Sequence, residues 1–225
     1  LGHKSQHCAT DCSPSASLKY LTQQVTALPQ PRLLLGYSMG ARAALQLMLA
    51  QPNSWQGLIL ISGNPGIESE PQRTERIQAD AKLVNQLELT GLQHFLEFWQ
   101  SRPLIRSQAN IPAAIRAPMQ ANRRQHSTTG LANSLRQFGP ASCPNLWPEL
   151  TQISCPILCL TGENDPKYQQ IAQRIAQLPS KPQHISIPQA GHMPHLEALT
   201  TSSHAIRQFI HQLTNAPAHA AANIS

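Results

Sequence analysis

The stretch RLLLGYSMGAR, residues 32–42, decides the fold of this chain. It places Ser38 between Gly36 and Gly40 in the pattern G-x-S-x-G, after an apolar run and before a segment rich in Ala, Leu and Met. Between a strand and a helix, this pattern puts the serine on a sharp, strained turn with its hydroxyl exposed. Glycines on both sides would let the strand and the helix pass closely. We therefore predict that Ser38 is a reactive serine.

The same alternation of strand and helix extends along most of the chain. Continuous apolar runs predict buried strands, and apolar residues at helical spacing predict helices. The expected strands are 32–36, 57–63, 155–162 and 184–188, and the expected helices are 17–28, 41–50, 168–178 and 197–213. Alternating strands and helices indicate the α/β class with a mostly parallel sheet. The 225 residues suffice for one sizeable core.

One long segment departs from this alternation. Residues 64–149 read as helical pieces broken by prolines, and they carry most of the arginines and two of the three Trp residues. We predict that they form an inserted helical cap between two parts of one core, residues 1–63 and 150–213. The polar residues 1–16 are expected to form an irregular loop, and residues 214–225 a disordered tail.

An activated serine needs a base, and the base needs an acid that orients it. Asp165, in the segment GENDPK, directly follows the strand expected at 155–162. Glu163 is the neighbouring alternative for the acid. The non-catalytic alternative for Asp165 is a turn residue before Pro166. We predict that Asp165 is the acid.

The base is expected in the segment QAGHMPHLE, after the strand at 184–188 and before the last helix. His192 is our first choice because a loop at this place can carry the imidazole over the serine. His195 is the second choice, with a surface position at a helix start as its non-catalytic alternative. The backbone N–H of Met39, at the positive end of the helix after Ser38, is the expected oxyanion donor.

The charge composition argues against a nucleic-acid partner. The chain has a formal net charge of +6, but charged residues are only 12% and no basic run is longer than the pair Arg123-Arg124. Twelve of the 17 basic residues are Arg, whose planar fork suits carboxylates and phosphates. An anionic small-molecule substrate would explain this excess, and simple compositional bias is the alternative.

The five cysteines do not form a recognisable metal-binding set, and we expect no metal. Cys155 and Cys159, four residues apart in a strand-like run, should place both side chains on one buried face. With Cys8, Cys12 and Cys143 they are expected to be reduced thiols. The sequence has no signal peptide and no apolar run near 18 residues, so we expect a cytoplasmic protein without a membrane partner.

Five segments together resemble a known family: GYSMGAR, SGNPGIESEPQRTERIQAD, FLEFWQSRP, TGENDPKY and AGHMPHLE. Over residues 32–213 the chain resembles the 2-succinyl-6-hydroxy-2,4-cyclohexadiene-1-carboxylate synthases, α/β-hydrolase-fold enzymes of the menaquinone and phylloquinone pathways. The resemblance implies elimination of pyruvate from a cyclohexene adduct with several carboxylates, without a cofactor. It also implies a triad of Ser38, Asp165 and His192, in which the serine removes a proton and is not acylated.

The resemblance also assigns a role to the arginines. It implies that Arg42, Arg76 and Arg123 each bind a substrate carboxylate, with Arg124 as a close rival of Arg123. Bidentate pairing suits an arginine to this task. The alternative for Arg76 is a surface ion pair with Asp80, four residues further along a helix.

Two more residues and two other functions complete the expectations. The resemblance implies that Tyr37 and Trp99 line the substrate pocket. A generic esterase, thioesterase or C–C hydrolase of the same fold is the first alternative function, and the arginines distinguish it because neutral esters do not need them. An inactive remnant or interaction protein is the second alternative.

The beginning of the chain differs from the usual pattern of this fold. Several strands usually precede the serine turn, together with a loop that completes the oxyanion hole, whereas only 37 residues precede Ser38 here. The opening LGHKSQ resembles the end of a segment that follows those strands. We therefore expect an N-terminally incomplete or shortened chain, with an exposed apolar edge at the strand at 32–36.

Overall fold

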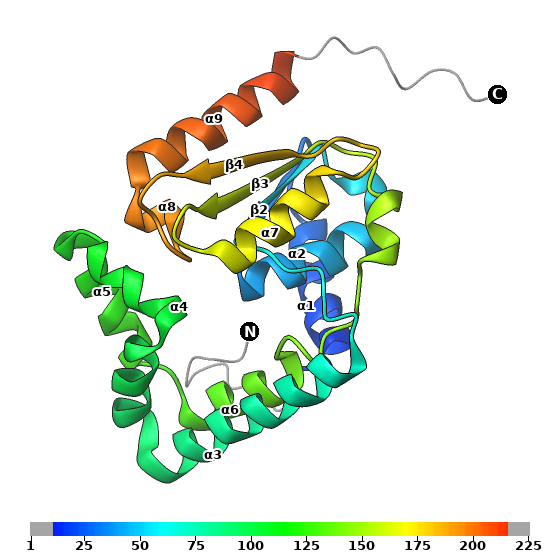
Figure 1. The fold of residues 1–225 in the computed structure, drawn as a ribbon. Helices are drawn as coiled ribbons and strands as arrows, with labels where there is room; N and C mark the ends of the chain where they lie inside the picture. Colours follow the sequence, from blue (N-terminus) through cyan, green and yellow to red (C-terminus); the bar gives the residue numbers. More distant parts are fainter. Residues whose placement is uncertain (1–10, 216–225) are drawn as a thin grey trace.

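The computed structural model describes residues 11–215, and its centre is a parallel sheet of four strands in the order β1-β2-β3-β4 (Figure 1). The strands are β1 (Leu33–Tyr37), β2 (Gly57–Ile61), β3 (Ile157–Gly162) and β4 (Gln183–Ile187). Each strand pairs in parallel with the next strand along the chain. The predicted α/β class with a mostly parallel sheet is therefore confirmed.

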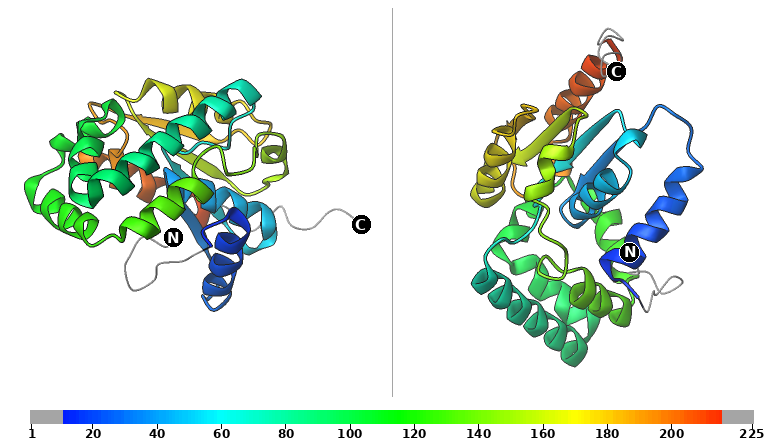
Figure 2. Two further views of the ribbon diagram at one scale, coloured as in Figure 1. Left: turned by 90° about the horizontal axis from the view of Figure 1, so that it is seen from below. Right: turned by 90° about the vertical axis from the view of Figure 1, so that its right-hand side faces the viewer.

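Helices cover both faces of the sheet (Figures 1 and 2). α2 (Met39–Ala50) and α7 (Pro166–Ala176) cover one face, with α1 (Pro14–Thr26) packed on α2, and α9 (Leu199–Asn215) covers the other. Alternate residues of the inner strand β2 face the two helical layers: Leu58 and Leu60 pack toward α2, and Ile59 and Ile61 toward α9. Side chains alternate between the two faces of a strand, and helices cover both faces of β2, so β2 is apolar at every position.

The first helix begins earlier than the range predicted at 17–28. Ser13 is its N-cap, with a side-chain oxygen that accepts a hydrogen bond from the backbone N–H of Ala16 at 3.3 Å, and Pro14 occupies the first turn. A capping serine followed by proline is a strong start signal, because the serine oxygen accepts an N–H of the first turn and proline has no N–H that would lack a partner. Residues 14–16 of the predicted loop are therefore helical, and residues 1–10 lie outside the described part.

The segment between β2 and β3 forms a separate helical layer (Figure 1). Its elements are α3 (Glu70–Ser101), α4 (Pro103–Arg106), the 3₁₀ helix η3 (Ser107–Asn110), α5 (Ala113–Arg124) and α6 (Thr128–Phe138). α3 and α6 share a small apolar core that includes Leu87, Phe95 and Ala132. α3 is kinked at Gly91, whose φ angle of 76° is one that only glycine adopts readily.

The chain returns to the main core slightly before the boundary predicted at 149/150. Leu146 and Trp147 pack in the same apolar cluster as Leu58 and Leu60, together with residues of the 3₁₀ helix η4 (Pro148–Gln152). A shorter 3₁₀ helix, η2 (Pro52–Ser54), connects α2 to β2. At the other end, α9 extends to Asn215, so the first two residues of the predicted tail are helical and residues 216–225 lie outside the described part.

Strand β1 is an edge of the sheet within residues 11–215. Leu33 is 37% and Leu35 50% exposed, as expected for an apolar strand with one covered side.

Within residues 11–215, no helix is long and apolar enough to cross a membrane. Cys143, Cys155 and Cys159 are free thiols, and Cys155 and Cys159 pack against the same apolar cluster. Cys155 lies before β3 and is only half-buried, so the predicted buried position is confirmed for Cys159 but not for Cys155.

Candidate active site

The turn at Ser38 has the strained geometry that the G-x-S-x-G pattern predicts. Ser38 has φ 48° and ψ −105°, and its backbone N–H donates to the carbonyl of Ile61 at 2.9 Å. A Cβ atom on Gly36 would lie 2.4 Å from the carbonyl oxygen of Gly40, so only glycine fits where β1 passes α2. A Cβ atom on Gly40 would meet nothing within 4 Å among the described residues. Close passage therefore requires Gly36 but not Gly40, so our expectation is confirmed for Gly36 and wrong for Gly40.

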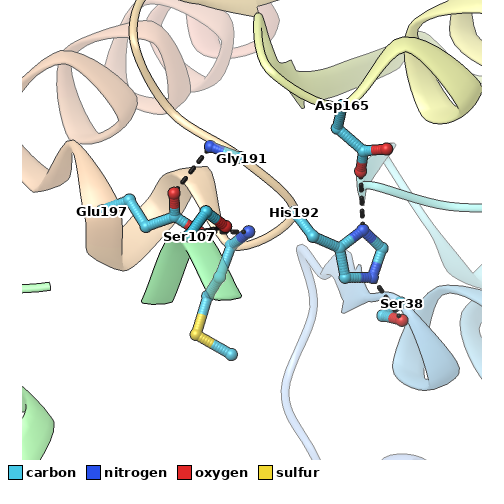
Figure 3. A network of polar contacts seen from close by, with 7 residues as sticks. Ser38, Ser107, Asp165, Gly191, His192 and Glu197 are labelled. Carbon is cyan, nitrogen blue, oxygen red and sulfur yellow. Dashed lines mark hydrogen bonds and ion pairs between the residues drawn. The ribbon is translucent and has the colours of Figure 1, made fainter. Parts of the chain in front are cut away.

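Ser38, His192 and Asp165 form a continuous chain of hydrogen bonds (Figure 3). The Ser38 hydroxyl lies 3.0 Å from Nε2 of His192, and Nδ1 of His192 lies 2.7 Å from Oδ2 of Asp165. His192 is 3% and Asp165 4% exposed, so the pair is shielded from water. In this arrangement Nδ1–H donates to the carboxylate, and Nε2 accepts from the serine hydroxyl.

The parallel sheet explains why residues so far apart in sequence meet. Ser38 directly follows β1, Asp165 is the third residue after β3, and His192 lies in the loop after β4. The carboxyl ends of parallel strands share one edge of the sheet, so the segments after them converge there. The order serine, acid, histidine along the chain then follows from the strand order.

The two alternatives for the acid and the base lie outside this chain of hydrogen bonds. A carboxylate oxygen of Glu163 accepts the backbone N–H of Gln189 at 2.8 Å, and no hydrogen bond joins Glu163 to His192 within residues 11–215. The ring of His195 packs on Tyr37, with centroids 4.7 Å apart. Burial, and secondarily the electrostatic interaction with His192, lower the pKa of His195 to about 4, so His195 is neutral near pH 7.

Two tyrosines flank the imidazole of His192. The ring centroid of Tyr37 lies 5.5 Å and that of Tyr168 4.5 Å from the centroid of His192. Burial raises the pKa of both phenols, which therefore stay protonated. Sequence reasoning anticipated Tyr37 but missed Tyr168, which it assigned only to a helix; its place three residues after Asp165 was the available signal.

The predicted oxyanion donor is the backbone N–H of Met39, the first residue of α2. The N–H groups of a first helical turn have no partner within the helix, and the helix dipole makes this end positive. An anion that forms beside Ser38 would be stabilised there.

Arg42 lies in the first turns of α2 and is buried, with 8% of its surface exposed. Its Nη2 donates to the carbonyl of Phe138 at 3.0 Å, and its guanidinium lies 5.9 Å from the centroid of the Phe138 ring. Its Nε is buried and finds no hydrogen-bond partner among the described residues. One donor of this cation is thus unused.

Arg76 forms the ion pair that was its non-catalytic alternative. Its Nε and Nη2 both lie 2.9 Å from one carboxylate oxygen of Asp80, and 35% of its side chain is exposed. It lines a cavity of about 770 Å³ that Tyr168 also lines, between the start of α3 and α7. Arg42 and Arg76 both act on Tyr168 electrostatically, opposing the rise of its pKa.

Arg123 and Arg124 face different surroundings at the end of α5. Nη2 of Arg123 donates to Oε1 of the buried Gln108 at 2.9 Å, and Arg123 and Trp99 line one cavity of about 140 Å³. Burial lowers the pKa of Arg123, and the charge of Arg123 partly offsets the rise that burial causes in the pKa of Tyr37, so Arg123 lies within electrostatic reach of the serine turn. Arg124 is exposed. The surroundings therefore favour Arg123 over Arg124.

Sequence reasoning also missed Glu197. Its carboxylate accepts hydrogen bonds from the backbone N–H groups of Gly191 and Met193, on both sides of His192, and from the hydroxyl of Ser107 (Figure 3). Its signal was its place five residues after His192, at the end of AGHMPHLE.

No group of His, Cys, Asp and Glu within residues 11–215 has the arrangement of a metal site.

Comparison with known proteins identifies the family. The model of the alpha/beta hydrolase family matches residues 1–202. A Bacillus subtilis relative, provisionally named 2-succinyl-6-hydroxy-2,4-cyclohexadiene-1-carboxylate synthase, is 35% identical over 178 residues, 79% of this chain and 65% of the relative. The synthase of the same name from Serratia proteamaculans is 31% identical over 79% of this chain and 67% of its own length. The chain therefore spans about two thirds of these curated relatives.

A solved structure supports the same grouping. The structure of MenH from S. aureus superimposes with a TM-score of 0.89 at 31% identity, over 95% of this chain and 82% of that chain. The matches thus cover both the sheet that carries the triad and the helical layer between β2 and β3. The chain belongs to the alpha/beta hydrolase family, in the group that contains the 2-succinyl-6-hydroxy-2,4-cyclohexadiene-1-carboxylate synthases.

Proposed function

We propose that this chain carries the catalytic triad of a lyase that eliminates pyruvate from a succinyl-enolpyruvyl-hydroxycyclohexene-carboxylate. The product is 2-succinyl-6-hydroxy-2,4-cyclohexadiene-1-carboxylate, the compound in the names of its relatives. The hydrogen-bonded chain from Ser38 through His192 to Asp165 is the observation that carries this proposal. The proposed reaction needs no cofactor, and we place it in the cytoplasm as part of the same proposal.

The triad would supply the base. Asp165 holds the His192 tautomer that carries its proton on Nδ1, which leaves Nε2 free to accept the proton of Ser38. As Nε2 takes that proton, the serine oxygen removes a proton from a ring carbon of the substrate. The electron pair of the broken C–H bond moves through the ring double bond, and the C–O bond to the enolpyruvyl group breaks. The departing enolate takes up a proton and becomes pyruvate, and His192 gives up the proton on Nε2, which returns the triad to its starting state.

The surrounding groups would stabilise negative charge on the substrate. The Met39 N–H lies at the positive end of α2, and Arg42, Arg76 and Arg123 supply three cations from different elements. Each cation is held by a protein group that a substrate carboxylate could replace or join. Tyr37 and Trp99 would form walls of the pocket. We propose an anionic small molecule as the binding partner, and neither a nucleic acid nor a membrane.

A parallel assay tests this proposal against the generic esterase. Purified chain is given the cyclohexene adduct, with pyruvate release followed by a coupled lactate dehydrogenase assay, and separately p-nitrophenyl acetate. We expect pyruvate release that is lost in Ser38→Ala, with an unchanged circular dichroism spectrum. Ester hydrolysis without pyruvate release would support the esterase, and no turnover of either compound would support the inactive remnant; either outcome overturns the proposal.

A further inference from the structure

A single carboxylate joins the histidine loop to the helical layer. One oxygen of Glu197 accepts the N–H of Gly191 at 2.6 Å, and the other accepts the N–H of Met193 and the hydroxyl of Ser107, both at 3.0 Å. Glu197 ends the short helix α8 (Pro194–Glu197). Figure 3 shows this group beside the triad, with Gly191 and His192 adjacent on one loop. The backbone is thus held directly before and directly after the catalytic imidazole.

The loop has little room to relax around this carboxylate. A Cβ atom on Gly191 would lie 2.2 Å from Oγ of Ser107 and 3.1 Å from a carboxylate oxygen of Glu197. On the other side, a Cβ atom on Gly162 would lie 2.1 Å from the carbonyl oxygen of Gly191. The backbone at Gly191 therefore lies tightly between the end of β3 and the Ser107–Glu197 pair.

The partner of Glu197 on the helical layer also connects to a candidate substrate cation. Ser107 is the first residue of η3, and the next residue, Gln108, accepts the hydrogen bond from Arg123. Gln108 is buried, with 5% of its surface exposed. One short 3₁₀ helix therefore carries both the contact to the histidine loop and the contact to Arg123.

We propose that Glu197 is a positioning residue for His192, and that through Ser107 it couples the orientation of the imidazole to the placement of the helical layer. The effect on turnover rests on the proposed function, whereas the effect on the imidazole does not. The carboxylate contacts neither Ser38 nor Asp165 by any hydrogen bond in the described structure, so its action is on the backbone that carries His192. A misplaced catalytic group can lower the rate by about 100-fold.

Glu197→Gln is the first test, with Glu163→Gln as its matched control. Glutamine has one acceptor oxygen, so its amide N–H₂ would face at least one N–H or O–H donor of the loop. We expect kcat to fall about 10- to 100-fold with KM changed less than about threefold. Glu163 also accepts one N–H of the same loop, from Gln189, but it is exposed and forms no hydrogen bond with His192 in the described structure, so its variant should retain kcat.

A spectroscopic measurement separates this inference from the proposed reaction. The Nδ1 proton of His192, hydrogen-bonded to Asp165, should give a downfield ¹H signal in ¹⁵N-histidine-labelled protein. We expect the signal to broaden or vanish in Glu197→Gln and to persist in Glu163→Gln. If the chain releases no pyruvate but shows this difference, the proposed function fails and the positioning role stands.

Ser107→Ala tests the contribution of the helical layer, and it keeps the proposal testable if the Glu197→Gln variant does not fold. It removes one donor and leaves both backbone N–H contacts, so we expect kcat to fall about threefold to tenfold with a native circular dichroism spectrum. In the double variant the two effects should not multiply, because both act through one carboxylate. Unchanged kcat and an unchanged Nδ1 signal in folded Glu197→Gln, or independent effects in the double variant, would overturn the proposal.

Discussion

The edge of the sheet and the helical layer present their functional groups in different ways. At the sheet edge, Ser38, His192 and Asp165 are already bonded to one another. The arginines are each bonded to a separate protein group instead: Arg42 to the carbonyl of Phe138, Arg76 to Asp80 and Arg123 to Gln108. The proton-transfer machinery is preorganised, whereas the cations are spread over several elements.

This difference follows from what positions each group. The triad residues follow the ends of strands of one parallel sheet, and the backbone ladder sets the spacing between strands. The arginines reach from helices on long, flexible side chains, whose ordering costs conformational entropy. When a substrate with several carboxylates binds, one of these carboxylates would replace Asp80 as the partner of Arg76. We therefore expect variants at the sheet edge to change kcat and variants of the cations to change KM.

The largest effect is expected for Asp165→Asn, which tests the preorganised side of this comparison. An asparagine amide can donate to Nδ1 and so favours the tautomer with its proton on Nε2, which cannot accept the proton of Ser38. We expect kcat to fall about 10³- to 10⁴-fold with KM nearly unchanged. Steady-state pyruvate release measures both constants. A loss below about tenfold would show that Asp165 does not set the tautomer.

The second effect concerns the strand-to-helix turn. Gly36→Ala would press a methyl group against the backbone of α2, and we expect the free energy of unfolding to fall by about 1–3 kcal/mol or more. Gly40→Ala is the matched control, because a Cβ atom there would meet no described atom within 4 Å apart from the adjoining backbone of its own helix, and alanine is the better helix former. Urea denaturation of both variants measures the difference. Equal destabilisation would contradict the role of Gly36 in close packing.

The third effect sharpens the comparison on the side of the cations. Arg123→Lys keeps the charge but loses the planar fork, so we expect KM to rise about tenfold with kcat nearly unchanged. Arg124→Lys is the control in the same turn of α5, since Arg124 is exposed, and it should leave KM unchanged. Reversed effects would transfer the carboxylate contact to Arg124.

The smallest effect at neutral pH is a dependence of stability on pH, to which His195 contributes only below about pH 6.5. In the folded protein burial lowers the pKa of His195 to about 4, and the ordinary value for an unfolded chain is about 6.5. Between these values the unfolded state binds a proton that the folded state does not, so His195 makes stability fall as pH decreases from about 6.5 to about 4. Above about pH 6.5 this contribution is absent.

His195→Gln provides the measurement for this effect. The wild-type Tm minus the variant Tm should be constant above about pH 7 and decrease toward pH 4, because other titrating groups cancel in the difference. If the Tm of the wild type and the Tm of the variant change in parallel from pH 8 to pH 4, folding does not lower the pKa of His195.

The sequence by itself predicted the sheet, the serine turn and the residues that meet at its edge. Apolar runs mark buried strands, and Asp165 and His192 were identified because each follows a strand closely. Local signals were misread where capping residues mattered more than apolar spacing, as at Ser13 before α1. The hydrogen bonds of the triad then follow from strands that lie side by side.

Only the tertiary structure decided which partners the remaining polar groups have. It pairs Arg76 with Asp80, separates Arg123 from Arg124, brings Tyr168 against His192 and places Glu197 between Ser107 and the histidine loop. These contacts join elements whose relative placement depends on the packing of the whole helical layer. Sequence periodicity reports which face of an element is apolar, but it carries no information about which distant side chain that face meets.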